Sequence, residues 1–263
     1  MDLGNLIENS QIFLLVLARV FAMLRIAPIS SSGNIPRIAR IGLAFFCAAA
    51  ILPSVTEGGY EIPQSGINYV FLLAGEAMVG IVLGFFLTVV FSAFLVAGQF
   101  FSLQMGFGAS QVFDPLAQVQ IPVMGQFLNL IAMFVFITTG GFQKIFLYGV
   151  EGSFRALKAV DLVVAKDFIL RTMIGGLGRL FEQALVIAFP ILGTLILVYV
   201  TMGLLAKAAP QMNLLLLGFP IAISAAFLVL FLALPLFMEV FSRIIDASFD
   251  GILQLAARAG GTQ

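Results

Sequence analysis

Long apolar runs separated by short polar stretches make up most of this chain. They cover Ile12 to Ile29, Tyr69 to Ala97, Gln126 to Tyr148, Ala184 to Ala206 and Asn213 to Met238. These runs predict membrane-type helices, because about 20 apolar residues in a helix cross the hydrocarbon core of a bilayer. The last two runs are joined by the turn AKAAPQ. A connector this short between two helices predicts an antiparallel hairpin.

The region between the first two long runs predicts a turn, a short helix and a loop. Arg37 and Arg40 end the turn, and Ile41 to Leu52 is long enough for a buried helix or half a bilayer crossing. Pro53 to Asn68 is acidic and rich in glycine and proline, which predicts a loop. The positive-inside rule places this loop outside and the two arginines inside.

Two polar regions follow later in the chain. Gly149 to Glu182 carries five of the thirteen basic residues, and we interpret it as a solvated connector with one or two short amphipathic helices. A binding surface is the alternative. The tail from Glu239 to Gln263 has apolar residues at helical spacing, which predicts an amphipathic helix. Simple counting of crossings leaves the basic connector outside, so either one segment is re-entrant or the chain is not a plain bilayer protein.

The stretch from Gln99 to Gly125 fits neither a normal membrane helix nor a normal loop. Gly106, Gly108, Pro115 and Pro122 interrupt it, and Asp114 is its only charge. Glutamines lie among its apolar residues at positions 104, 111, 118 and 120. Glycine admits backbone angles that other residues avoid, and proline ends helices. Polar, broken backbone at membrane depth is tolerated only where protein buries it or where it lines a wet cavity. The stretch is therefore the first candidate for a pore or gate element.

Isolated charges in the apolar runs are the second candidate site. Arg19 and Arg25 interrupt the first run, and Glu76 is the only charge in the next long one. Charges within membrane helices usually face other protein and have a partner. We therefore expect Glu76 to pair with Arg19 or Arg25, although Arg25 is also placed to end its span at the interface. Lys207, in the hairpin turn, is a further candidate for helix or subunit pairing.

Composition supports a membrane protein and excludes several kinds of site. Of the 263 residues, 61% are hydrophobic and 10% are charged, against roughly 25% charged in soluble domains. The net charge is zero, so no basic surface for nucleic acid is predicted. The chain has no histidine and one cysteine, Cys47, which excludes a histidine-based metal site, a Ser-His-Asp triad and an internal disulfide. We predict no catalytic residue and no cofactor.

The sequence LQMGFGASQVFDPLAQVQIPVMGQFLNLIAMFVFI resembles the central signature of the FliR/SctT family of type III export-gate proteins. The resemblance continues in RIAPISSSGNIPRIARIGLA before it and LLAKAAPQMNLLLLGFPIAI after it. It implies an all-α membrane-type fold in which residues 1–183 form a FliP-like part and residues 184–263 a FliQ-like hairpin with its tail. The implied partners are FliP-like, FliQ-like and FlhB-like proteins and exported unfolded polypeptides. The implied location is the bacterial inner membrane at the flagellar basal body.

The resemblance also implies a role for the broken stretch, as a plug loop in a closed channel. The side chains of Phe107, Val112 and Phe113 would occlude the channel. Gly106 and Gly108 would act as a hinge, and Asp114-Pro115 would form a turn. The expected plug and gate residues are Gln104, Met105, Gly106, Phe107, Gly108, Ser110, Gln111, Val112, Phe113, Asp114, Pro115 and Pro122.

Two other functions compete with this interpretation. A secondary transporter of a small solute would use Arg19, Glu76 and Asp114 as a coupling relay. A purely structural membrane scaffold would leave the Gly/Gln/Phe stretch without a role. The sequence does not decide between a flagellum and an injectisome.

Overall fold

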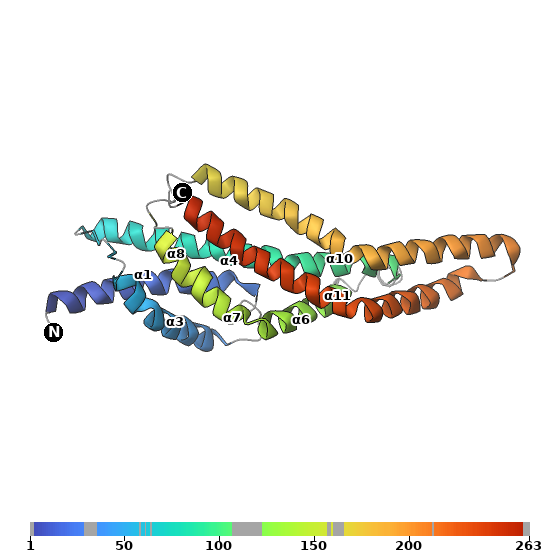
Figure 1. Ribbon diagram of the computed structural model, residues 1–263, viewed down its shortest axis with the longest axis horizontal. Helices are drawn as coiled ribbons and strands as arrows, with labels where there is room; N and C mark the ends of the chain where they lie inside the picture. The colour runs from blue at the N-terminus through green and yellow to red at the C-terminus, as the bar shows by residue number, and fades with distance from the viewer. Residues whose placement is uncertain are drawn as a thin grey trace, which may run out of the picture. The chain divides into compact units, whose positions relative to one another are not determined.

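The computed structural model describes residues 3–28, 36–57, 59–60, 62–63, 65–106, 123–156, 159, 166–211 and 213–259 (Figure 1). Regular structure in this part of the chain is entirely helical, so the predicted all-α class is confirmed. The helices are α1 (Leu3–Ile26), α3 (Arg37–Glu57), α4 (Gly66–Gln104), α6 (Val123–Thr138), α7 (Gly141–Lys144), the π-helix η1 (Ile145–Glu151), α8 (Gly152–Ala156), α10 (Lys166–Ala208) and α11 (Leu214–Ala259).

Several of these helices are long and apolar enough to cross a membrane. Within the described residues five pass this test: Ile7–Ile26, Arg37–Glu57, Gly66–Gln104, Lys166–Ala208 and Leu216–Ala247. Val123–Thr138 and Gly141–Phe154 add a sixth if they are taken as one span, bent by 73°. With 39, 43 and 46 residues, α4, α10 and α11 exceed a bilayer crossing. At about 1.5 Å per residue they reach roughly 58–69 Å, about twice the ~30 Å hydrocarbon core.

The prediction for the second helix was wrong at both ends. Instead of a short helix ending at Leu52, α3 has 21 residues, begins at Arg37 and contains Pro53. Proline removes one backbone donor from a helix interior, but a membrane-type helix tolerates this loss when neighbouring groups satisfy the freed carbonyls. The carbonyl that loses its donor at Pro53 is that of Ala49, four residues earlier. Separately, in the last turn the Thr56 hydroxyl donates to the carbonyl oxygens of Leu52 at 3.1 Å and Pro53 at 2.9 Å.

The predicted connector also differs from the structure. Its first half contains the end of η1 and all of α8, but its second half is the start of α10, which continues without interruption to Ala208. The three glycines at 175, 176 and 178 do not end this helix, although each costs roughly 1 kcal/mol relative to alanine. The charged and glycine-rich composition of this region favours a loop, but the region is helical despite that local preference.

The chain divides into two compact units, each assembled from separated segments. Unit 1 comprises Met1–Val90, Ile137–Leu177 and Ile245–Gln263, and unit 2 comprises Phe91–Phe136 and Gly178–Ile244. The division at residue 183 expected from the family resemblance is of a different kind, and it stays a prediction.

Each unit has an apolar core of its own. In unit 1, α1 and α3 pack together, with Phe13 and Phe45 edge to face at 5.1 Å between ring centroids. Unit 2 contains an aromatic group in which Phe94 and Phe241 lie 4.3 Å apart and Phe91 and Phe136 lie 5.6 Å apart.

The hairpin predicted from the AKAAPQ turn is present: α10 ends at Ala208 and α11 returns beside it from Leu214 (Figure 1). The predicted amphipathic tail is the C-terminal part of α11, and its apolar positions Phe241, Ile244 and Ile245 are buried.

Candidate functional site

A buried ion pair joins α1 to α4 in unit 1. The Nη2 atom of Arg19 lies 2.5 Å from Oε2 of Glu76, and the Nε group of Arg19 donates to the same oxygen at 2.6 Å. Both side chains have 0% exposed surface. Charges this deep persist only when they are paired and hydrogen-bonded, so the two groups depend on each other.

Two further donors complete the environment of the Glu76 carboxylate. The hydroxyl of Tyr60 donates to Oε1, and the backbone N–H of Ala159 donates to the same oxygen at 3.2 Å. Burial raises the pKa of the Tyr60 phenol, and the charge of the adjacent carboxylate raises this pKa further. The phenol therefore keeps its proton and serves as a permanent donor to Glu76.

The Arg19 guanidinium has polar and aromatic neighbours on its other side. Its Nη1 group donates to Oγ of Ser153 at 2.9 Å, and the Ser153 hydroxyl in turn donates to the carbonyl of Val150 at 2.7 Å. The guanidinium carbon lies 3.6 Å from the centroid of the Phe154 ring, a cation–π contact. We call Arg19, Glu76, Tyr60, Ser153 and Phe154 the charge cluster.

Two glycines of α4 let α1 come close enough to form this pair. A Cβ atom at Gly80 would overlap the carbonyl oxygen of Arg19, and one at Gly84 would lie 2.8 Å from the carbonyl oxygen of Met23. Glu76, Gly80 and Gly84 are each four residues apart, so they share one face of the helix. This GxxxG step therefore sets the distance at which Arg19 meets Glu76.

The second candidate site is the end of α4, in unit 2. Gly106 has φ 91°, in the left-handed region that favours glycine at helix ends. The Phe219 ring of α11 occupies the space that a Cβ atom at Gly106 would need. The Tyr199 hydroxyl of α10 donates to the carbonyl oxygen of Gln104.

A glycine pair fixes the approach of α4 to α6 near the same place. A Cβ atom at Gly98 would overlap the Cα and N atoms of Gly125, so the two backbones are in direct contact. The helices that precede and follow residues 107–122 therefore touch at this glycine pair.

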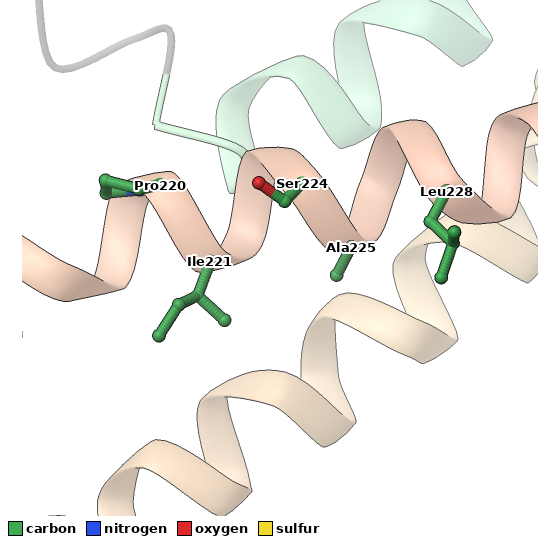
Figure 2. Close-up of a pocket in the computed structure, with 5 residues that line it drawn as sticks. All are labelled: Pro220, Ile221, Ser224, Ala225 and Leu228. Carbon is green, nitrogen blue, oxygen red and sulfur yellow. The ribbon is translucent and has the colours of Figure 1, made fainter.

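A shallow apolar groove of about 470 Å³ lies on α11. Pro220, Ile221, Ser224, Ala225 and Leu228 line it, and Figure 2 shows Ile221 and Ala225 pointing to the same side. Ser224 supplies the only side-chain polar atom of this lining. Among the described residues, no group of three or more His, Cys, Asp or Glu side chains could hold a metal ion.

The chain is similar in sequence to known bacterial export proteins. Residues 10–248 match the family described as "Bacterial export proteins, family 1". The chain belongs to this family. The flagellar biosynthetic protein FliR of Borreliella burgdorferi is 28% identical over 256 residues, covering 96% of this chain and 93% of its own. FliR of Bacillus subtilis is 28% identical, covering 98% and 99%. The surface presentation of antigens protein SpaR of Shigella flexneri is 30% identical over 81% of this chain and 82% of its own. The family predicted from the signature is confirmed.

In this export protein, the four predicted pairing charges differ in burial. It brings Arg19 and Glu76 together, whereas Arg25 and Lys207 are exposed in the single chain. All four were predicted to be buried charges that pair helices or subunits, and Arg25 and Lys207 are not buried in the single chain. The reason is position, since Arg25 lies in the last turn of its helix and Lys207 next to the hairpin connection. A role for them in subunit pairing stays a prediction.

The predicted plug and gate residues of the export protein fall largely outside the described residues. Gln104, Met105 and Gly106 are described, and α4 runs unbroken to Gln104, so the break begins later than the Gln99 expected from sequence. The plug role of all these residues stays a prediction. Those outside the described residues are Phe107, Gly108, Ser110, Gln111, Val112, Phe113, Asp114, Pro115 and Pro122.

Sequence reasoning missed most partners of both sites. Tyr60 was placed in an acidic loop and Ser153 in a solvated connector, yet both are buried against the ion pair. A usable signal existed, because a lone buried carboxylate needs more donors than one arginine supplies. Tyr199 and Phe219 carry no comparable signal, since each is an aromatic residue in an apolar helix.

Proposed function

We propose that this chain is a subunit of a type III protein export gate in the bacterial inner membrane, at the base of a flagellum. The observation that carries the proposal is the family match over residues 10–248, together with flagellar biosynthetic relatives that align over nearly their whole length. The described helices suit the role, because five of them are long and apolar enough to cross a membrane. The proposed partners are FliP-like, FliQ-like and FlhB-like subunits and the exported unfolded polypeptides.

The proposed mechanism needs no catalytic group. A channel that passes unfolded polypeptide and retains ions requires an apolar constriction that can be displaced. We assign this constriction to the side chains of Phe107, Val112 and Phe113, with Gly106 and Gly108 as the hinge. The left-handed backbone of Gly106 supports the hinge assignment, because the chain turns there out of α4 at an angle that other residues adopt only with strain.

Ion conductance tests the plug. Deletion of Gly106 to Pro115 in the assembled complex should make cells or liposomes leaky to ions, because the apolar seal is removed. Deletion of the last ten residues, 254–263, is the matched control and should leave the conductance at the level of the intact protein. An unchanged conductance after the first deletion refutes the plug assignment.

Co-purification tests the complex itself. When the chain is expressed together with FliP-like and FliQ-like subunits, all three should purify as one stable assembly. Native mass measurement then gives the stoichiometry. The transporter alternative instead requires solute transport by the purified chain alone in liposomes. The charge cluster favours export over a relay, because Arg19 and Glu76 already satisfy each other away from solvent.

A further inference from the structure

Two side chains of the C-terminal hairpin hold the end of α4, all within unit 2. Tyr199 in α10 donates its hydroxyl to the carbonyl oxygen of Gln104, and the ring of Phe219 in α11 fills the space beside Gly106. We call Tyr199, Phe219, Gln104 and Gly106 the α4 latch. All four residues belong to the part of the chain that the structure describes.

The hydrogen bond from Tyr199 meets a specific need of the helix end. The last carbonyl groups of an α-helix have no partner within the helix. The final turn of α4 is closed by Met105 N–H donating to the Phe101 carbonyl at 2.8 Å and by Gly106 N–H donating to the Leu103 carbonyl at 3.2 Å. The Gln104 carbonyl lies beyond these bonds, and it accepts a donor from another helix instead.

The two helices of the hairpin are in contact close to both latch side chains. Tyr199 and Met202 are three residues apart and so share one face of α10. A Cβ atom at Gly218 would lie 2.9 Å from the methyl carbon of Met202, which shows that α10 and α11 are in close contact there. Phe219 follows directly, and Pro220 begins the groove of Figure 2. A displacement of the hairpin therefore moves both contacts with α4 at once.

We propose that Tyr199 and Phe219 are positioning residues that couple the C-terminal hairpin to the end of α4, so that the hairpin holds Gln104 and Gly106 in the arrangement of the closed channel. The effect on conductance rests on the function proposed above. The coupling itself does not, because it concerns only contacts among described residues.

Hydrogen exchange measured on the purified complex tests the coupling. In Tyr199→Phe and Phe219→Ala, the amides of residues 101–106 should exchange about three- to tenfold faster, as expected for loss of a contact worth one hydrogen bond. Tyr69→Phe is the matched control, since the Tyr69 hydroxyl donates to the backbone carbonyl of Gln11 at 2.9 Å. Phe231→Ala is the second control, because Phe231 lies on the same helix as Phe219 and is 73% exposed. Exchange at the control rate in both latch variants overturns the proposal.

A suppressor experiment tests the direct contact between Gly106 and Phe219. Gly106→Ala should disturb the end of α4, because its Cβ atom collides with the Phe219 ring and its φ is strained. Adding Phe219→Ala removes the collision, so the double variant should exchange more slowly in residues 101–106 than Gly106→Ala alone. Independent effects of the two changes contradict a direct contact.

Ion conductance then links the latch to the gate. Phe219→Ala should raise the conductance, and Phe231→Ala should not. If deletion of residues 106–115 raises the conductance while the latch variants change neither exchange nor conductance, the coupling proposal is refuted and the plug assignment stands. If the deletion does not raise the conductance, the plug assignment is refuted, and the exchange rates still test the coupling.

Discussion

Removing one charge of the Arg19–Glu76 pair should cost far more than removing both. Both side chains are fully buried, and Nη2 of Arg19 lies 2.5 Å from Oε2 of Glu76. Either single change therefore leaves an uncompensated charge away from water. Glu76→Gln strands the guanidinium, and Arg19→Met strands the carboxylate. Each single change should destabilise the protein by about 3–5 kcal/mol, the usual cost of breaking a buried pair from one side.

The double variant Arg19→Met/Glu76→Gln leaves no charge in the charge cluster. The introduced glutamine side chain keeps an oxygen that can accept from Tyr60 and from the Ala159 N–H, the two donors that Glu76 has besides Arg19. Its amide nitrogen is the new unpaired group, and this should cost about 1–3 kcal/mol. Independent effects would instead add to about 6–10 kcal/mol. The predicted coupling is therefore at least about 3 kcal/mol, more than a factor of 100 in the unfolding equilibrium.

Thermal unfolding of the detergent-purified complex is the assay. At roughly 2–4 °C per kcal/mol for a chain of this size, each single variant should lower the midpoint by about 6–20 °C. Lys144→Met and Asp246→Asn provide the control, because that ion pair is 28% and 49% exposed and should contribute at most about 1 kcal/mol. Single and double changes that add within error at Arg19 and Glu76 would refute the reasoning.

Three further predictions follow from the contacts of the described residues. Gly98→Val should prevent assembly of unit 2, because its side chain meets the backbone of Gly125; reduced yield and protease sensitivity measure this. Tyr60→Phe should destabilise the protein by about 1–3 kcal/mol, because Glu76 loses a buried donor; the thermal midpoint measures this. Arg243→Ala should change stability by no more than about 0.5 kcal/mol, since its helical i,i+4 pair is exposed, and an effect above about 1 kcal/mol contradicts this assignment.

The apolar pattern was sufficient to predict the helical class, the hairpin after Ala206 and the need of Glu76 for a basic partner. These features depend on solvation, since an apolar run must be buried and a lone charge must be paired wherever the chain folds. The pattern was not sufficient for helix ends. α3 passes through Pro53, and α10 begins at Lys166 and includes three glycines, because tertiary packing outweighs the local helix-breaking preferences of proline and glycine.

The partners within each site were decided only by the tertiary structure. Arg19 and Arg25 lie six residues apart in the sequence, but only Arg19 lies beside Glu76, because Gly80 sets α1 against α4 at that level. Tyr60, Ser153 and Ala159 then reach the pair from segments distant in the chain. The stretch that begins the candidate gate carries its own glycine signal. Its attachment to Tyr199 and Phe219 depends on how the hairpin packs, which residue type alone does not specify.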